Sequence, residues 1–191
     1  MTRAVRPATT DDVWAIHETA RDSWHAAYDG ILGPDRVDEV VDDWYAIGDL
    51  ESAIYGAHSR EGVAFLVAEP GSDPASRTDR PTDRDRDIDR ECVGFAHAVP
   101  WPEDSSVAYL ARLYVAPDVW GEGTGTALLE RLEADLEPSF DRMRLSVLAA
   151  NDVGISFYES AGFDRVATRE TDLAPGLEEY VYERPIERGR G

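Results

Sequence analysis

Leu113-Tyr-Val-Ala-Pro-Asp-Val-Trp-Gly-Glu-Gly-Thr-Gly-Thr-Ala-Leu-Leu129 is the stretch that decides the fold. Its apolar start predicts the end of a strand at Val115, and Pro117 stops the ladder because proline has no N–H to donate. Three alternating glycines follow, and an apolar helix face begins after them. Glycine lets the backbone approach a ligand closely, and the free amides at a helix start attract phosphate. The stretch therefore predicts a phosphate site, although a tight turn without a ligand would carry the same glycines.

Neither of the common nucleotide-binding loops fits this turn. A P-loop needs Gly-Lys-Ser/Thr, and the sequence contains no lysine. The dinucleotide fingerprint needs Gly-x-Gly-x-x-Gly, and neither Gly121-x-Gly123 nor Gly123-x-Gly125 is followed by the third glycine. A nucleotide-binding domain is therefore disfavoured.

Outward from the turn, hydrophobic periodicity predicts a single α/β domain over residues 1–191, built on one sheet. The predicted order is strand, two helices, three strands, helix, strand, helix and two strands. The strand at 107–115 is almost continuously apolar, which predicts burial on both faces. Helices are predicted to begin near Thr9 or Thr10, near Pro34, after Gly125 and at Asn151.

The segment 70–90 breaks this pattern, because it is rich in Asp, Arg, Pro, Ser and Thr and nearly free of apolar residues. Such a composition cannot bury enough surface to order itself. We predict a mobile insert between two strands of the same sheet. A role in binding a partner is the less favoured alternative.

The charge is strongly acidic, with 39 acidic residues, 19 basic residues and a formal net charge of −20. The basic residues are all arginine, and the acidic ones spread along the whole chain. This pattern favours a halophilic source over a surface that binds a basic partner. It argues against nucleic acid as a ligand, because phosphate binding needs a basic surface.

Other bulk features exclude several classes. No apolar run approaches the roughly 20 residues of a membrane helix, and the first residues lack a secretory core, so we expect a cytoplasmic protein without a membrane partner. Cys92 is the one cysteine, which leaves no internal disulfide and no zinc site. We expect Cys92 to be a small buried residue in a strand and expect no metal.

Two blocks resemble the GNAT N-acetyltransferase superfamily. Leu113–Pro117 and Gly123–Gly125 are similar to its acyl-CoA motif, Arg/Gln-x-x-Gly-x-Gly/Ala after a strand end, with Trp120 where Arg or Gln is usual. Leu145-Ser-Val147, Asn151 and Phe157–Phe163 match a second block. The resemblance covers nearly the whole chain outside the insert. It implies a mixed, mostly antiparallel twisted sheet with splayed central strands and about four flanking helices.

The resemblance implies transfer of an acetyl group from acetyl-CoA to a primary amine by direct attack. The acceptor would be a small-molecule amine or a peptide N-terminus, and a homodimer is common for this fold. The alternative is a non-catalytic module that binds acyl-CoA and regulates a partner.

The resemblance also assigns the cofactor site residue by residue. The main chain of Leu113, Tyr114 and Val115 would pair with pantetheine, and the Leu113 amide is the assigned holder of the oxyanion. Asn151 would contact the cofactor arm, or only cap a helix. Tyr158 would bind the cofactor and protonate the CoA thiolate, or only fill the core. Pyrophosphate would bind the amides of Trp120, Gly121, Glu122, Gly123, Thr124, Gly125 and Thr126.

The general base and the acceptor pocket are less defined. Tyr109 occupies the strand position where many family members carry Glu, so Glu103 is the assigned base, with Asp104, His97 or a water chain as alternatives. The acceptor would contact Trp24, His25 and Tyr28, which could equally be core aromatics. Because Glu122 adds a carboxylate to the turn, we expect CoA binding to improve with salt.

Overall fold

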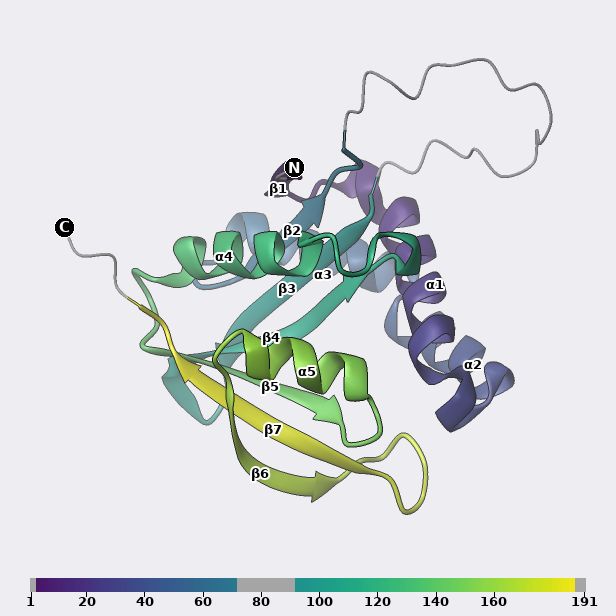
Figure 1. The fold of residues 1–191 in the computed structure, drawn as a ribbon. Coiled ribbons are helices and arrows are strands. Elements are labelled where there is room, and N and C mark those ends of the chain that lie inside the picture. Colours follow the sequence, from purple (N-terminus) through teal and green to yellow (C-terminus); the bar gives the residue numbers. More distant parts are fainter. Residues whose placement is uncertain (1–2, 72–91, 188–191) are drawn as a thin grey trace.

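The computed structural model of the protein describes residues 3–71 and 92–187, and Figure 1 shows its fold. All of the predicted insert except Pro70 and Gly71 lies outside these residues. The strands are β1 Val5–Pro7, β2 Ala64–Ala68, β3 Gly94–Trp101, β4 Asp104–Val115, β5 Arg142–Leu148, β6 Asp164–Glu170 and β7 Glu178–Pro185. The helices are α1 Val13–Leu32, α2 Pro34–Trp44, α3 Ile47–Ser59, α4 Thr124–Leu136 and α5 Asp152–Ser160, with short 3-10 turns η1 Thr10–Asp12 and η2 Pro117–Val119.

The described strands form one seven-stranded sheet in the order β1-β2-β3-β4-β5-β7-β6. Every neighbouring pair is antiparallel except β4 and β5, which are parallel. The prediction of a mixed, mostly antiparallel sheet is confirmed.

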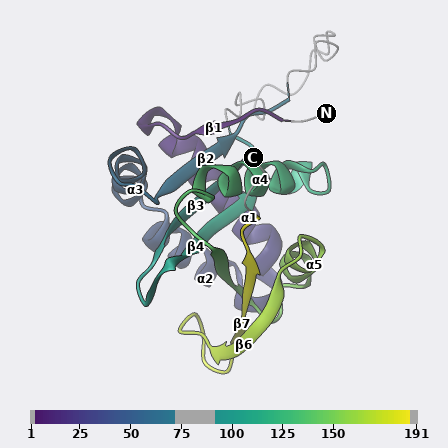
Figure 2. The same cartoon turned by 90° about the vertical axis from the view of Figure 1, so that its left-hand side faces the viewer.

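Helices cover both faces of the sheet and create two apolar cores. Successive side chains of a strand point to opposite faces, so Leu66 of β2 packs in the core under α4, whereas Val67 packs in the core formed by α1, α2 and α3. Figure 2 shows α3 and α5 on opposite sides of the sheet. The predicted apolar face of α4 is confirmed, because its leucines are all buried: Leu128, Leu129, Leu132 and Leu136.

The central strands separate beyond a short shared segment. The parallel pairing of β4 with β5 covers only Val107–Tyr109 against Arg142–Arg144, although β4 continues to Val115 and β5 to Leu148. A register shift between His97 and Ala98 gives β4 one extra residue opposite β3, and such a bulge bends a strand locally. The predicted splay of the central strands is therefore present at the carboxyl ends of β4 and β5.

Two details differ from the sequence predictions. The helical region after Pro34 forms two helices, α2 and α3, because Tyr45 leaves the helical conformation and α3 restarts at Ile47. The strand β4 is not buried on both faces along its length. Ala111 is exposed, and the residues after it are half-buried, because β5 no longer lies beside them.

Among the described helices, none is long and apolar enough to cross a membrane.

Candidate active site

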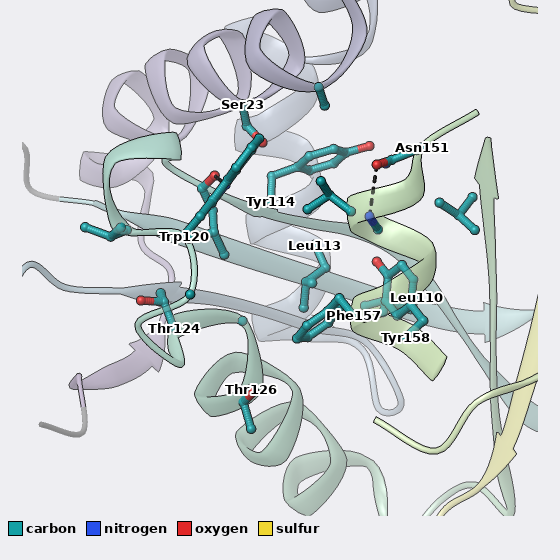
Figure 3. Close-up of a pocket in the computed structure, with 18 of the residues that line it drawn as sticks. Ser23, Leu110, Leu113, Tyr114, Trp120, Thr124, Thr126, Asn151, Phe157 and Tyr158 are labelled. Atoms are coloured by element: carbon teal, nitrogen blue, oxygen red, sulfur yellow. Dashed lines mark hydrogen bonds between the residues drawn. The ribbon is translucent and has the colours of Figure 1, made fainter. Parts of the chain in front are cut away.

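A pocket of about 430 Å³ opens where β4 and β5 separate (Figure 3). Its walls come from β4, the glycine turn, the start of α4, the end of β5, and helices α5 and α1. Segments distant in sequence therefore meet at the splay, and each wall contributes different chemistry.

The β4 wall presents main-chain groups. The Ala116 amide donates to the Val93 carbonyl at 2.8 Å, and antiparallel pairing alternates its hydrogen-bonded pairs. By this alternation, the main chain of Tyr114 faces β3, whereas the main chains of Leu113 and Val115 face the opening toward β5. The Val115 carbonyl accepts a hydrogen bond of 2.7 Å from the Trp120 indole. The main chain of Tyr114 is thus not available to pair with pantetheine, and that part of the prediction is wrong. Tyr114 lines the pocket with its side chain.

The glycine turn presents amides. Gly121 and Gly123 have φ of +79° and +83°, which L side chains rarely adopt. The Ala127 amide, which donates to the Gly123 carbonyl at 3.0 Å, makes the first bond of the α4 ladder. The preceding amides of Thr124, Gly125 and Thr126 have no acceptor within the helix, and these three residues line the pocket.

Two further features of the turn bear on ligand binding. A Cβ at Gly125 would lie 3.2 Å from the Phe157 ring, so the glycine lets α5 pack closely on α4. The Thr124 side chain is only 1% exposed, and its hydroxyl lacks a hydrogen-bond partner within the described residues. Unsatisfied buried hydroxyls are uncommon and often mark a ligand or water site.

Trp120 lines the pocket, and Glu122 does not. The Glu122 carboxylate forms an ion pair with Arg3, which directs its charge toward the N-terminal segment. The carboxylate predicted to repel CoA is therefore partly neutralised and turned outward.

Helix α5 contributes Asn151 and Tyr158. The Asn151 side chain caps α5, because its Oδ1 accepts the Gly154 amide at 2.9 Å (Figure 3). Its Nδ2 donates to the Tyr28 hydroxyl of α1 at 2.9 Å. Tyr158 is 9% exposed and lines the pocket, and burial raises the pKa of its hydroxyl above the ordinary value.

The pocket has no charged side chain among its lining residues in the described part of the chain. Glu103, the predicted base, is exposed in the turn between β3 and β4, and ten residues of strand place it roughly 30 Å from Leu113. Asp104 bonds to Ser106 at 2.6 Å and pairs with Arg142 at 3.1 Å. The structure places neither carboxylate in the pocket, and the prediction that Glu103 is the base is therefore corrected.

His97, the alternative base on β3, is also outside the pocket lining, and so is Tyr109, which holds the strand position where many family members carry Glu. Burial first, and then the Arg112 charge, lower the pKa of His97 to about 3, and its Nδ1 lies 3.1 Å from the Arg112 guanidinium. Tyr109 packs against Trp101, with ring centroids 5.0 Å apart. His97 is thus a neutral imidazole engaged in the core.

Of the three predicted acceptor contacts, only Tyr28 lines the pocket. Trp24 is 2% exposed and donates its indole N–H to the Tyr45 hydroxyl at 3.1 Å, so it is a core residue behind Tyr28. The His25 ring lies 2.7 Å from Asp29 and 3.3 Å from Asp38, which turns it toward α2.

Cys92 is buried as predicted, but it precedes β3 and does not lie within a strand. It is fully buried next to β3, its thiol donates to the Gly94 carbonyl at 3.2 Å, and burial raises its pKa to about 11. No group of three or more His, Cys, Asp or Glu side chains within the described ranges is placed to hold a metal ion.

Sequence reasoning missed part of the lining. Phe157 lies beside Tyr158 in the second motif block, so that block could have predicted it as a lining residue. Ser23 and Ala27 are four residues apart and share one face of α1, and Ala27 directly precedes Tyr28 in the sequence, so both could have been considered once Tyr28 was proposed. Ser146 and Val147 also belong to the second motif block and could have been found with it. The remaining missed lining residues carry no distinctive pattern: Leu110, Ala111, Val119, Val153 and Gly154.

Comparison with known proteins agrees with this geometry. Residues 44–163 match the family model described as the acetyltransferase (GNAT) family. A spermidine N(1)-acetyltransferase of Thermoplasma acidophilum is 26% identical over 184 residues, covering 96% of this chain and 99% of that protein.

Solved structures share the fold. The PaiA N-acetyltransferase of Thermoplasma acidophilum, solved in complex with coenzyme A, has a TM-score of 0.75 at 24% identity, covering 97% of this chain and 99% of its own. The ribosomal-protein-S18-alanine N-acetyltransferase of Escherichia coli has a TM-score of 0.65 at 19% identity, covering 98% and 96%. Because the family model matches more than half of the chain, and the matched residues include the glycine turn, Asn151 and Tyr158 of the pocket, this chain belongs to the acetyltransferase (GNAT) family.

Proposed function

We propose that this chain, as a single domain, transfers the acetyl group of acetyl-CoA to a primary amine. One observation carries the proposal. A single uncharged pocket joins the outward-facing main chain of Leu113 to the unbonded amides at the start of α4. An elongated ligand with amides at one end and a pyrophosphate at the other matches that sequence of groups.

The residues present fit acetyl-CoA. The Leu113 carbonyl and the Val115 amide can pair with the pantetheine arm as a short added strand, which leaves the Leu113 amide for the thioester oxygen. The amides of Thr124, Gly125 and Thr126, together with the dipole of the thirteen-residue α4, suit a pyrophosphate. The Thr124 hydroxyl can rotate to supply a further donor. Binding then rests on main-chain amides, since the lining residues include no cationic side chain.

Acetyl-CoA supplies an activated thioester whose carbonyl carbon accepts the amine. In this site the Leu113 N–H stabilises negative charge as it develops on the thioester oxygen. The amine nitrogen bonds to the carbonyl carbon, the carbon–sulfur bond breaks, and Tyr158 donates its proton to the departing thiolate. The raised pKa of Tyr158 keeps its hydroxyl protonated at neutral pH. Attack is direct, because the Cys92 thiol is buried and protonated.

In this proposal the proton lost by the amine goes to water, and water returns a proton to Tyr158 once the CoA thiol has formed. The described lining offers no carboxylate or imidazole to receive it. The amine must therefore arrive unprotonated or lose its proton to solvent at the pocket mouth.

The acceptor class rests on the relatives. One relative is named for acetylation of spermidine, and a protein of the same fold is named for acetylation of an alanine of ribosomal protein S18. We propose a primary amine of a small molecule or peptide N-terminus, with Tyr28 on the wall beside it. The net charge of −20 suits a cationic acceptor and supports a halophilic source.

The pocket without a base also favours a second candidate, a non-catalytic module that binds acyl-CoA. Release of CoA thiol separates the two. The protein is incubated with acetyl-CoA in molar salt with a panel containing spermidine, a monoamine, amino acids and a peptide with N-terminal alanine. Thiol release that depends on one amine supports the transferase. CoA binding by calorimetry without release for any amine supports the module, and absence of CoA binding contradicts both.

A further inference from the structure

The hydrogen bond between Asn151 and Tyr28 joins α5 to α1 across the pocket. Both residues line the pocket, Tyr28 from α1 and Asn151 from the start of α5. The direction of this bond is fixed by its neighbour. The Gly154 amide donates to the Asn151 Oδ1 at 2.9 Å, so the side-chain NH₂ group must be the end that faces Tyr28.

The Tyr28 hydroxyl oxygen consequently accepts from Asn151, and its own proton has to point elsewhere. Among the hydrogen bonds of the described residues, the bond from Asn151 is the one that involves this hydroxyl, and no acceptor takes the Tyr28 proton. Buried hydroxyls normally satisfy their hydrogen-bonding groups. The Tyr28 O–H is therefore an oriented donor in a pocket wall that has no charged side chain.

The Tyr28 ring cannot easily turn away. It packs against Trp24 with ring centroids 4.6 Å apart, and Trp24 is held by its bond to the Tyr45 hydroxyl at 3.1 Å. A buried aromatic layer thus fixes the ring, and Asn151 fixes the hydroxyl. A donor that is oriented before binding loses little freedom when the ligand arrives.

We propose that Tyr28 donates this hydrogen bond to an amide carbonyl of the pantetheine arm, and that Asn151 is a positioning residue acting through Tyr28. This inference rests on the proposed function. A carbonyl is the suitable acceptor, because a donor aimed at the attacking nitrogen would occupy the lone pair that must react. The contact would hold the arm from the wall opposite Leu113.

Two substitutions separate this role from simple packing. Tyr28→Phe removes the donor and keeps the ring. Asn151→Asp keeps an N-cap for Gly154, but its second oxygen accepts from Tyr28 and turns the Tyr28 proton away from the pocket. Tyr55→Phe is the matched control, because Tyr55 lies on α3 and is 73% exposed.

The test is the dissociation constant of CoA, measured by calorimetry in molar salt, which reduces the long-range repulsion between CoA and the negative charge that Asn151→Asp adds. We expect Tyr28→Phe and Asn151→Asp each to weaken CoA binding by about threefold to tenfold. The double variant should bind no more weakly than the weaker single variant, because both remove one contact. Tyr55→Phe should bind as the wild type does.

Wild-type affinity in Asn151→Asp overturns the inference, even where Tyr28→Phe is weaker or fails to fold, since the direction of the bond would then not matter. Additive losses in the double variant also overturn it. These outcomes leave the proposed function intact. Failure of the wild-type protein to bind CoA overturns the proposed function and this inference together.

Discussion

Tyr158 combines burial, a place in the pocket wall and a hydroxyl whose pKa is raised by desolvation. A phenol in this state remains protonated across the neutral range, as an acid that protonates a thiolate requires. The second motif block pointed to this position from the sequence, but the pocket and the burial came only with the structure.

Removing the Tyr158 hydroxyl should slow the chemical step. We expect Tyr158→Phe to lower kcat by about 100-fold, the lower end for loss of a general acid, with the dissociation constant of CoA changed little. Steady-state rates over pH 6 to 9 and CoA titration measure both; because the pKa is raised, the wild-type rate should not fall on the alkaline side of this range. Tyr109→Phe, outside the pocket, is the matched control. Full turnover in Tyr158→Phe would remove Tyr158 as the acid.

His97 makes a separate prediction about stability. Its pKa in the folded protein is about 3, against 6.5 for an ordinary histidine. The unfolded chain therefore binds the proton more readily between these values, so the contribution of neutral His97 is fully present above pH 6.5 and is lost as pH falls toward 3. We expect the free energy of unfolding to fall more steeply over this window in the wild type than in His97→Gln. Urea denaturation at several pH values measures it, and parallel curves would contradict the account.

At the scale of elements, the strand, turn and α4 were predictable because proline and glycine mark their boundaries. The division of the region after Pro34 into α2 and α3 was not, because Tyr45 and Ala46 carry no strong stop signal and the break depends on packing around buried Tyr45. The alternation that turns the Tyr114 main chain toward β3 depends on strand pairing, which one strand's sequence does not contain.

For the glycine turn, we predict the effect of a side chain at Gly123 on stability and on CoA binding. Gly123 has a φ of +83° at the start of α4, and a Cβ there would meet open pocket space. We expect Gly123→Val to lose about 1–2 kcal/mol of stability from the left-handed conformation and to lose CoA binding.

Gly33→Val is the matched control for this change. Gly33 also has a φ of +83° with open space at its Cβ, but it ends α1 and lies outside the pocket lining. Its stability loss should be at least as large, because its ψ of 149° against 5° for Gly123 lies in a region that essentially only glycine adopts, and CoA affinity should be retained. Thermal unfolding and CoA titration of both variants measure this, and intact CoA binding in Gly123→Val would refute the pyrophosphate assignment.

At the scale of the whole molecule, a net charge of −20 surrounds a pocket whose described lining is uncharged. Long-range repulsion of anionic CoA should dominate at low salt, and the Debye length falls to about 3 Å at 1 M. Contacts with main-chain amides survive that screening.

We therefore expect the affinity for CoA to rise from low to molar salt. Titrations of CoA at increasing KCl concentration, with circular dichroism at each point to confirm folding, measure this dependence. A steady loss of affinity with salt in the folded protein would show that cationic side chains dominate binding.

The central claim is that this pocket brings an amine and acetyl-CoA together for direct transfer. The most direct measurement incubates the protein with acetyl-CoA carrying an isotopically labelled acetyl group and an accepted amine, and follows the label and the CoA thiol by mass spectrometry and a thiol reagent. The account predicts labelled amide and free CoA in equal amounts, with no labelled protein. Thiol release without labelled amide, or label retained on the protein, would contradict it.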